Sequence, residues 1–472
     1  MARPERVQVD DYPPLARPVR AARRLSDAEA LMWAAERDPS LSSAFLSVTF
    51  LDRAPDLDRF RRRLAAAVVG VRRMRQRIEP GGLLSPVPVW RDDPEFDIAY
   101  HVAKLAVPKD ATERQLLDVG GAFLAEPFDP ERPLWQLRIV ERLGDERAVL
   151  LAKFHHTITD GVGGVRLSAS FLDISPDAEA PLELLADPEP EAEASRGLVN
   201  DLADAAADAL RRPIDFGRVA LSEAASAARN PIGVARATLG QLVVTDRAHS
   251  TLWRGHRSTD RRLDVHRVDL AEVKAAAKTL GGTVNDLFVA AVVGAAVEYH
   301  GARGVDVDAF RVSIPLSTRT DRSAGGNDFM PARVLLPATG TRVDRFREIG
   351  TRLGDVKAQR SSGLGWAVAG LLTGLPSPLL VTLARQQIET VDFACSNVRG
   401  APFPLYVSGA RVLSTHPMGP TGGTAANATV MSYEGSLDLG LVTDPAAVDD
   451  PAELTALLAA EFEALLAEAA RT

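Results

Sequence analysis

Two adjacent histidines stand at the end of an apolar run, in the heptapeptide HHTITDG at residues 155–161. The run Arg147–Phe154, together with Leu134–Val140 and a Gly144-Asp145 turn, predicts a β-hairpin. A side chain at the junction of a strand and a loop is held in place and still reaches a cleft. The chain has only 8 histidines in 472 residues, so this placement indicates a functional site at the end of the second strand.

Proton transfer is the chemistry that this heptapeptide suggests. An imidazole titrates near neutral pH, so it can accept a proton and return it, and we expect His156 to act as this base. Neighbouring side chains on a strand point to opposite faces, so we expect His155 to face away from His156. Asp160 and Gly161 follow beyond a turn, where Asp160 can fold back and fix the loop through an arginine or a backbone donor. All four are candidate catalytic residues.

Other interpretations of the histidine pair remain open. Both residues could simply end a strand, which suits His155 better than His156. A metal site would need at least one more ligand from elsewhere, and since the remaining histidines are scattered singly we expect no metal. Serine-hydrolase chemistry would require a nucleophile motif such as GxSxG, which the chain lacks. The remaining histidines stand at positions 101, 249, 256, 266, 300 and 416.

Composition narrows the class of protein. Hydrophobic residues make up 46% and charged residues 25%, as in soluble globular proteins, and the length suits two domains of about 200 residues each. The net charge of −8 argues against nucleic acid as a partner. The single cysteine, Cys395, excludes an internal disulfide and a cysteine-ligated zinc, and fits a reducing compartment such as the cytoplasm. Residues 1–24 contain no apolar segment of a secretion signal.

The chain divides into two α/β segments separated by a stretch of different composition. We place an N-terminal domain at residues 1–175, a helical linker at 176–250 that is rich in Ala, Asp, Glu and Arg, and a C-terminal domain at 251–472. Ser26, followed by Glu29, predicts the start of a helix. Further helices are expected at residues 57–71, 270–280, 286–299 and 451–470, and strands at 44–51, 263–268, 310–315, 407–412 and 428–433.

The segment Gly363–Ala384 is the longest stretch without a charged residue. Its length would suit a membrane span, but four glycines and the pair Pro376 and Pro378 divide it. We therefore expect two short apolar helices joined at Leu375–Pro378. These helices either pack in a core or rest on a lipid surface, with Trp366 at the interface.

Several further motifs follow one another in a characteristic order. HHxxxDG resembles the motif of the acyl-CoA-dependent acyltransferase superfamily, which includes chloramphenicol acetyltransferase and peptide condensation domains. The whole set resembles one branch of it, the bacterial wax ester synthase/diacylglycerol acyltransferase family, over roughly residues 25 to 470. The matching elements are Pro133-Leu134-Trp135, Thr283–Asp286, Arg311–Ser317, Gly326-Asn327, Ser396-Asn397-Val398, Pro404–Tyr406, Gly409–Val412, Tyr433–Leu437 and Asp444-Pro445.

This resemblance implies both a fold and a reaction. The implied fold is α/β, with two chloramphenicol-acetyltransferase-like domains that share a central cleft and are joined by the helical linker. The implied reaction moves a long-chain acyl group from acyl-CoA to the hydroxyl of diacylglycerol or of a long-chain alcohol, giving triacylglycerol or a wax ester. It implies no cofactor, since acyl-CoA is a substrate. Such substrates further imply contact with a membrane or a lipid droplet surface from the cytoplasm.

The resemblance also marks five candidate substrate-binding residues: Trp135, Asn285, Asp286, Ser396 and Asn397. Each also has a plain structural alternative. Trp135 could be a core aromatic residue. Asn285 and Asp286 could simply begin a helix, and Ser396 and Asn397 could make a turn.

Departures from the family pattern bear on the choice of acceptor. Arg399 stands where proline often follows the SNV element. The Gly326-Asn327 element usually continues to an aromatic residue and glycine, whereas here it reads Asn327-Asp328-Phe329-Met330. Two other functions remain open. One is a condensation-type or polyketide-associated acyltransferase with carrier-bound substrates, although the chain contains no carrier segment. The other is a non-catalytic lipid-binding protein of the same fold, although an intact HHxxxDG favours catalysis.

Overall fold

The computed structural model describes most of the two α/β segments and little of the stretch between them. The described residues are 24–81, 88–142, 147–159, 167–168, 171–178, 250–255, 257–317, 329–359, 382 and 385–471. The expected linker at 176–250 and the uncharged segment Gly363–Ala384 therefore lie almost entirely outside the described residues.

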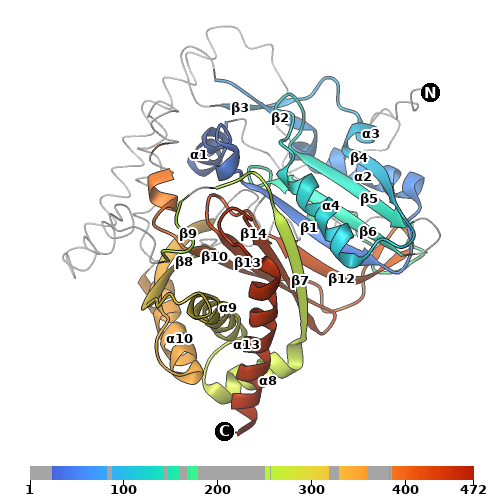
Figure 1. Cartoon of the computed structure of the whole chain (residues 1–472). Helices are drawn as coiled ribbons and strands as arrows, with labels where there is room; N and C mark the ends of the chain where they lie inside the picture. The colour runs from blue at the N-terminus through green and yellow to red at the C-terminus, as the bar shows by residue number, and fades with distance from the viewer. Residues whose placement is uncertain are drawn as a thin grey trace.

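In the described part of the chain, two six-stranded sheets and one two-stranded sheet form the framework (Figure 1). The first large sheet has the strand order β11-β12-β1-β6-β5-β4. The expected hairpin is present as β5 (Trp135–Arg142) and β6 (Ala148–His155), and β1 (Ala44–Leu51) pairs antiparallel with β6. The other strands of this sheet are β4 (Val102–Val107), β11 (Tyr406–Val407) and β12 (Ala410–Met418), while β2 (Gln76–Glu79) and β3 (Val89–Asp92) form the small sheet.

Helices of the first segment pack around this sheet. α1 (Asp27–Ala35) begins with the expected capping box, in which the Ser26 backbone N–H donates to the Glu29 carboxylate at 2.7 Å and the Glu29 N–H donates to the Ser26 hydroxyl at 3.2 Å. α2 (Leu57–Gly70) buries Phe60, Leu64 and Val68 in the core of this half. The remaining helices here are α3 (Ile98–His101), α4 (Glu113–Ala125) and the short 3₁₀ helices η2 (Pro39–Leu41) and η3 (Arg72–Arg75).

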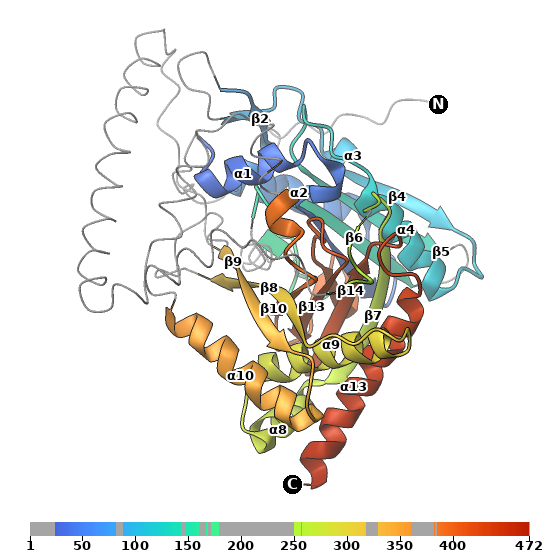
Figure 2. The same ribbon diagram turned by 60° about the vertical axis from the view of Figure 1, so that its left-hand side comes forward.

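The second large sheet has the order β7-β14-β13-β10-β8-β9. Helices α8, α9, α10 and α13 cover one face of it (Figures 1 and 2). The strands are β7 (Arg262–Asp269), β8 (Ala309–Ser317), β9 (Phe329–Pro337), β10 (Phe393–Arg399), β13 (Ala426–Tyr433) and β14 (Ser436–Thr443). The helices are α8 (Leu270–Leu280), α9 (Val284–Gly301), α10 (Arg342–Gln359) and α13 (Pro451–Arg471).

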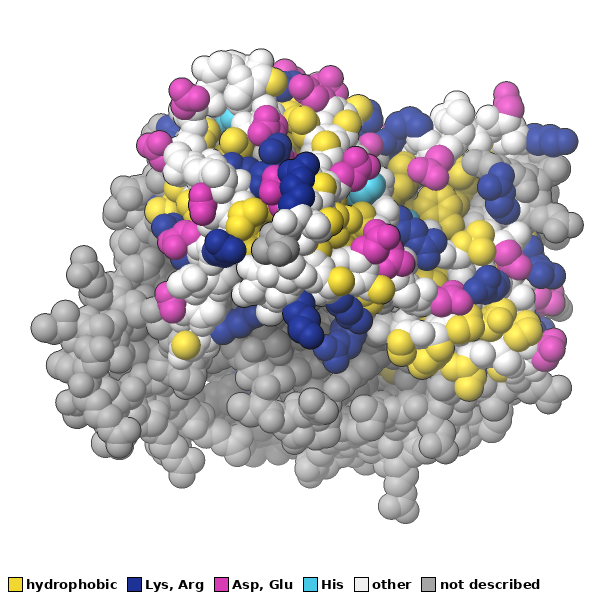
Figure 3. Space-filling model, turned by 90° about the horizontal axis from the view of Figure 1, so that it is seen from below, with side chains coloured by type: hydrophobic (Ala, Val, Ile, Leu, Met, Phe, Trp, Pro, Cys, Tyr) yellow, Lys and Arg dark blue, Asp and Glu magenta, His cyan; other side chains and the backbone are white. Residues whose placement is uncertain are grey.

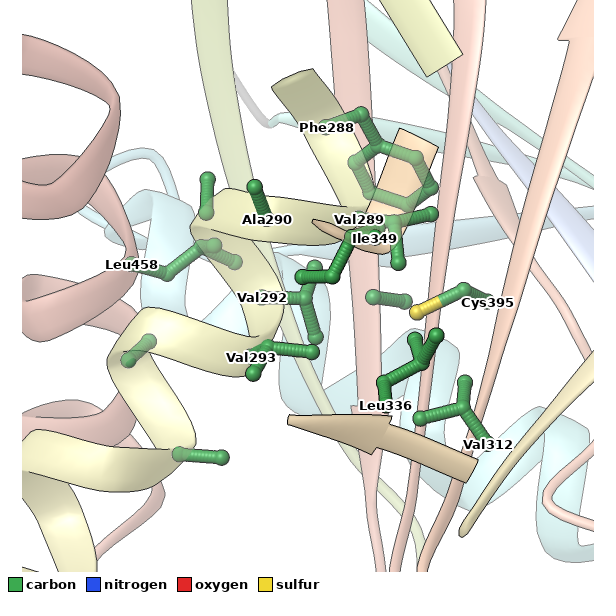
Figure 4. Packing of buried hydrophobic residues seen from close by; sticks show 14 of the residues in the cluster. Phe288, Val289, Ala290, Val292, Val293, Val312, Leu336, Ile349, Cys395 and Leu458 are labelled. Atoms are coloured by element: carbon green, nitrogen blue, oxygen red, sulfur yellow. The ribbon is translucent and has the colours of Figure 1, made fainter. Parts of the chain in front are cut away.

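Helix α9 is the centre of the core in this half. It is apolar on nearly all sides, as is typical of a helix that other elements surround. Figure 4 shows Val289, Val292 and Val293 of α9 next to side chains of the sheet, including Val312 and Cys395. Burial raises the pKa of the Cys395 thiol, so this residue behaves as a small apolar side chain.

Strand β12 joins the two halves of the molecule. It comes from the C-terminal half of the chain but pairs antiparallel with β1, in a register that places Leu46 opposite Met418. Behind it lies β14, where Gly440 approaches β12 so closely that an added Cβ would stand 2.2 Å from the Pro417 carbonyl oxygen. The expected division at residues 175 and 251 therefore does not separate the two sheets, because residues 406–418 belong to the first one.

The strand expected at residues 407–412 is interrupted by a tight turn. Tyr406–Val407 and Ala410 onwards form the two arms of a hairpin, which Ser408 and Gly409 connect. Both linking residues have positive φ, 45° and 94°, the combination that matches the twist of a two-residue hairpin. The sequence did not reveal this turn, because the apolar residues on either side of it form a pattern that is typical of one continuous strand.

The surface of the described part mixes charges of both signs. The face seen in Figure 3 shows Lys and Arg interspersed with Asp and Glu, without a large area of one sign. Within the described residues, no single helix is long and apolar enough to cross a membrane. Among the described helices, α8 and α9 reach that length and composition only when taken together, and they meet at a bend of 90°.

Candidate active site

A cavity of about 720 Å³ lies between the two large sheets. Strands β1, β6 and β12 supply its wall on the first sheet, and strands β8, β9, β10 and β13 supply the opposite wall. Most lining side chains are apolar, and His156 stands among them. Examples of the lining are Phe45, Phe154 and Pro417 on one side and Ser396, Thr429 and Met431 on the other.

His156 lies one residue beyond the end of β6. Its backbone N–H donates to the carbonyl oxygen of Ser43 at 3.1 Å, which ties it to the residue just before β1. Its ring packs against Phe45, with ring centroids 4.7 Å apart, and it lines the cavity. The start of β1 therefore fixes both the backbone and the ring of the residue that we predicted to be the base.

The protonation state of His156 follows from its surroundings. Burial lowers the pKa of its imidazole to about 4, and the neighbouring His155 contributes to the decrease. The ring is consequently neutral at physiological pH. A neutral imidazole has one ring nitrogen without a proton, and this nitrogen can accept a proton from a substrate. His156 is therefore in the protonation state that a general base requires.

His155 faces away from the cavity, as predicted, and its side chain is 1% exposed. Its Nδ1 accepts a hydrogen bond from the Thr157 backbone N–H at 3.1 Å and lies 2.7 Å from the Thr157 hydroxyl. Its Nε2 lies 2.9 Å from Glu36 Oε1. Because Nδ1 is an acceptor, the proton of a neutral ring must be on Nε2, facing Glu36. His155 thus holds the loop and α1 together.

Glu36 connects this arrangement to the start of β1. It caps the C-terminus of α1, and its Oε1 also accepts the Ser43 backbone N–H at 2.5 Å. Burial raises the pKa of the Glu36 carboxyl. Its contacts with His155 and with the Ser43 amide lower the pKa by more than burial raises it, so the pKa ends below its usual range. The carboxylate is therefore ionised. Ser43 connects it to His156, because the Ser43 N–H donates to Glu36 and the Ser43 carbonyl oxygen accepts the His156 N–H.

The last two residues of the heptapeptide are candidates that the described structure does not include. Asp160 and Gly161 lie outside the described residues. The residues between them and the histidines form a turn, in which Thr157 is fully buried. Within the part of the chain that the structure describes, no three His, Cys, Asp or Glu side chains converge in a way that could hold a metal ion.

Of the four candidates from the second half, two line the cavity and two do not. Ser396 and Asn397 line it from β10, a strand rather than the turn that we considered. Asn285 touches this pair, since Asn397 Nδ2 lies 3.4 Å from Asn285 Oδ1. Asp286 is 6% exposed and caps α9, where it accepts the Thr283 N–H at 2.9 Å and the Thr283 hydroxyl at 2.8 Å. Asp286 is thus part of the cap of α9 and is not among the described residues that line the cavity, and its substrate-binding role stays a prediction.

Trp135 is a core residue and does not line the cavity. It is 0% exposed, and its indole N–H donates to the Met74 carbonyl oxygen at 2.6 Å. Its ring stacks on His101 with centroids 4.2 Å apart, while His101 Nδ1 lies 2.7 Å from the Trp135 carbonyl oxygen. This packing supports β5, next to the strand that ends at the histidines, and the substrate-binding role of Trp135 stays a prediction.

Several residues around the cavity belong to no motif that we identified in the sequence. Glu36 and Ser43 are ordinary polar residues between a helix and a strand, and only the fold brings them to the histidines. Ser47, Thr49 and Thr415 line the cavity from β1 and β12. Ser47 and Thr49 stand two residues apart in β1 and therefore share one face of the strand, but no local pattern shows what that face meets.

Comparison with solved structures shows which fold the chain has. A wax ester synthase/diacylglycerol acyltransferase from Marinobacter aquaeolei VT8 is similar with a TM-score of 0.64 at 20% identity, over 95% of this chain and 100% of that one. The first condensation domain of the calcium-dependent antibiotic synthetase is similar with a TM-score of 0.63 at 16% identity, over 95% and 97%. The expected two-domain, acyltransferase-like α/β fold is confirmed.

The family follows from the sequence comparisons. The model of the wax ester synthase/diacylglycerol acyltransferase catalytic domain matches residues 25–288, and that of the C-terminal domain of the same family matches residues 326–466. A Mycobacterium tuberculosis protein provisionally named as a diacylglycerol O-acyltransferase is 31% identical over 458 residues, which is 94% of this chain and 92% of the relative. The chain belongs to the wax ester synthase/diacylglycerol acyltransferase family, and it is accordingly an acyl-CoA-dependent acyltransferase.

Proposed function

We propose that this enzyme transfers a long-chain acyl group from acyl-CoA to the hydroxyl of diacylglycerol, or of a long-chain alcohol. One observation carries the proposal: a neutral histidine, His156, lines a largely apolar cavity of about 720 Å³ between the two sheets. An apolar cavity favours alkyl chains, and the histidine supplies a base where a hydroxyl would meet the thioester. The names of the relatives support the same class of substrate.

The reaction balances with His156 as the only proton carrier. The imidazole takes the proton of the acceptor hydroxyl as its oxygen attacks the thioester carbonyl carbon. The C–S bond then breaks, and the imidazolium returns the proton to the departing thiolate, which leaves as free CoA. The products are an ester and CoA, with no acyl-enzyme and no cofactor. A positioned base contributes about 10²–10⁴-fold, and holding both substrates together contributes further.

Condensation-type chemistry is a second candidate, because condensation domains share the fold. One of them, a starter condensation domain of rhizomide synthetase, has been described in complex with C8-CoA, at a TM-score of 0.58 and 14% identity. Likeness at this level concerns the fold alone, whereas the family models match most of this chain. Acyl-CoA, rather than a carrier-bound acyl group, is therefore the better-supported acyl donor.

Association with lipid is a further part of the proposal. The substrates are almost insoluble in water, so we propose that the enzyme works in the cytoplasm and meets a membrane or lipid droplet surface peripherally. The sequence feature behind this proposal is the uncharged segment Gly363–Ala384, which lies almost entirely outside the described residues.

Product analysis tests the proposed reaction directly. The purified protein is offered labelled palmitoyl-CoA with diacylglycerol or with hexadecanol, and both the lipid products and the free thiol are measured. We expect triacylglycerol or wax ester to form together with an equal amount of CoA. Release of CoA without an ester product would indicate hydrolysis, and neither product would indicate a lipid-binding protein.

A further inference from the structure

Three hydroxyl side chains form a cluster on one wall of the otherwise largely apolar cavity. Ser47 Oγ and Thr415 Oγ1 lie 3.1 Å apart, Thr49 Oγ1 and Thr415 Oγ1 also lie 3.1 Å apart, and Ser47 and Thr49 are 3.4 Å apart. Ser47 and Thr49 come from β1, and Thr415 comes from the neighbouring strand β12. We call these three residues the hydroxyl cluster.

The hydroxyl cluster lies beyond His156 along the same wall of the cavity. Phe45, Ser47 and Thr49 share one face of β1 because side chains alternate along a strand, and all three line the cavity. Phe45 is the residue whose ring packs on His156. At a rise of about 3.3 Å per residue, Ser47 is about 7 Å and Thr49 about 13 Å further along the strand than Phe45.

The hydroxyl cluster favours a ligand that has a polar atom next to Ser47, Thr49 and Thr415. Each hydroxyl has one proton to donate and can rotate to direct it, so the cluster can exchange a mutual hydrogen bond for one to a ligand carbonyl. An alkyl chain over the same spot would gain nothing from these groups. The cavity-lining residues that β1, β6 and β12 contribute carry no cationic side chain, whereas Arg333 lines the opposite wall from β9. At the hydroxyl cluster a neutral carbonyl is therefore a better match than a phosphate.

Two parts of the proposed substrates carry neutral carbonyls a few atoms from the reacting centre. One is an ester group of a diacylglycerol, next to the attacking hydroxyl. The other is an amide of the pantetheine arm of acyl-CoA, next to the thioester. The pantetheine arm continues to phosphates, for which this wall offers no cation. A diacylglycerol continues to alkyl chains, for which the Leu150, Ala152 and Phe154 side chains of this wall are suited.

We infer that the hydroxyl cluster binds an ester carbonyl of a diacylglycerol and so favours a glycerolipid over a long-chain alcohol as acceptor. This inference rests on the proposed function and names the acceptor class of the same site. Thr415 bonds to both other members, so it is the member whose loss disturbs the cluster most. A long-chain alcohol has no carbonyl, so its turnover does not depend on the cluster.

The test compares acceptors that differ only in the carbonyl. Wild-type enzyme and the variants Thr415→Val, Thr49→Val and Ser47→Ala are assayed with a 1,2-diacylglycerol, the matching 1,2-dialkylglycerol and hexadecanol, with palmitoyl-CoA as donor. We expect wild-type kcat/KM to be about fivefold higher for the diacyl than for the dialkyl acceptor, the effect of one neutral hydrogen bond. In Thr415→Val this ratio should fall toward one, because kcat/KM falls for the diacyl acceptor and not for the dialkyl acceptor.

A buried threonine away from the cavity provides the control for this experiment. Thr443→Val changes a buried threonine of β14 that does not line the cavity, and it should leave the ratio as in the wild type. A wild-type enzyme that does not distinguish the two glycerolipids overturns the inference, even if every variant unfolds. A rise in the KM for palmitoyl-CoA with an unchanged acceptor ratio overturns it in favour of the donor amides. Absence of turnover with all three acceptors removes the proposed function and the inference together.

Discussion

Among single residues, the two adjacent histidines have different surroundings and different tasks. His156 faces the cavity and is kept neutral by burial, whereas His155 faces Glu36 and Thr157 and holds the loop. The alternation of side chains at the end of a strand produces this division without any special backbone geometry. One position can thus be adjusted for chemistry while the next secures its placement.

Replacing His156 by alanine should abolish most of the acyl transfer and leave the fold intact. No other described residue offers a base at the same place, so we expect kcat to fall by about 10²–10⁴-fold. The measurement is thiol release from palmitoyl-CoA by protein whose melting temperature matches the wild type. His266→Ala, on β7 and outside the cavity lining, is the control and should retain activity. Retention of more than about a tenth of wild-type kcat would contradict the role of His156 as base.

The depressed pKa of His156 predicts an unusual pH profile. The protonated ring is inactive, and the pKa of about 4 means that protonation begins only well below neutrality. Activity should therefore stay level from about pH 8 down to about pH 6 and fall as the pH approaches 4. The measurement is kcat/KM with a short, soluble acyl donor, alongside circular dichroism to follow folding. A half-maximal point near 6.5, the ordinary value of histidine, would show that burial does not control this group.

Among the helices and strands, α1 and β1 act together to place the loop that carries His156. Glu36 at the end of α1 accepts the Ser43 N–H, and the Ser43 carbonyl accepts the His156 N–H. The residues between them include the short 3₁₀ helix η2, so the whole connection from α1 to β1 is fixed at both ends. Because a catalytic group must be held within a fraction of an ångström, such support from outside the cavity affects the rate.

Replacing Glu36 by alanine should therefore reduce kcat without removing any group that contacts the substrate. We expect a decrease of about tenfold, the size of effect that a small misplacement of a catalytic group produces. Glu36→Gln retains an oxygen that can accept the Ser43 N–H, so it should recover most of the activity. Steady-state kinetics that separate kcat from KM test this, and equal losses in both variants would show that the negative charge, rather than the hydrogen bond, is what matters.

The contact between β14 and β12 should be equally sensitive. A methyl group on Gly440 would stand 2.2 Å from the Pro417 carbonyl oxygen, and backbone cannot yield there without moving β12. Gly440→Ala should therefore lower the melting temperature by several degrees, in line with a loss of about 1–3 kcal/mol for overpacking. Gly354→Ala, on the exposed side of α10 with no atom within 4 Å, is the matched control. It should be neutral or slightly stabilising, because alanine favours helix more than glycine does.

Local patterns account for the parts of the fold that the sequence predicted. The strand at 44–51, the hairpin that ends at His155 and the helix at 270–280 have clear periodicity and turn signals, and the structure contains all three. Strand β10 was less visible, because Ser396 and Asn397 resemble a turn although they lie in the middle of a strand. The places of Glu36 and of β12 depend on contacts between distant segments, which no local pattern reveals.

For the molecule as a whole, the main prediction concerns lipid. If the uncharged segment Gly363–Ala384 contacts a lipid surface, the purified protein should co-float with vesicles. The double variant Leu371→Asp and Leu379→Asp should weaken floatation by more than tenfold, because each buried leucine is worth about 1.5–3 kcal/mol. Turnover of short, soluble donors and alcohols should remain near the wild-type value. Unfolding of this variant, seen as a loss of the cooperative thermal transition, would indicate that the segment belongs to the core.

The pairing of β12 with β1 also has a consequence during protein synthesis. Ser47 of β1 and Thr415 of β12, whose hydroxyls lie in contact, are 368 residues apart, so one edge of β1 has no strand beside it until β12 has left the ribosome. At about 5–20 residues per second, this wait lasts roughly 20–70 s. During that time an unpaired strand edge is open to pairing with other chains. The yield of active enzyme in a cell should therefore depend on how well chaperones protect the nascent first half.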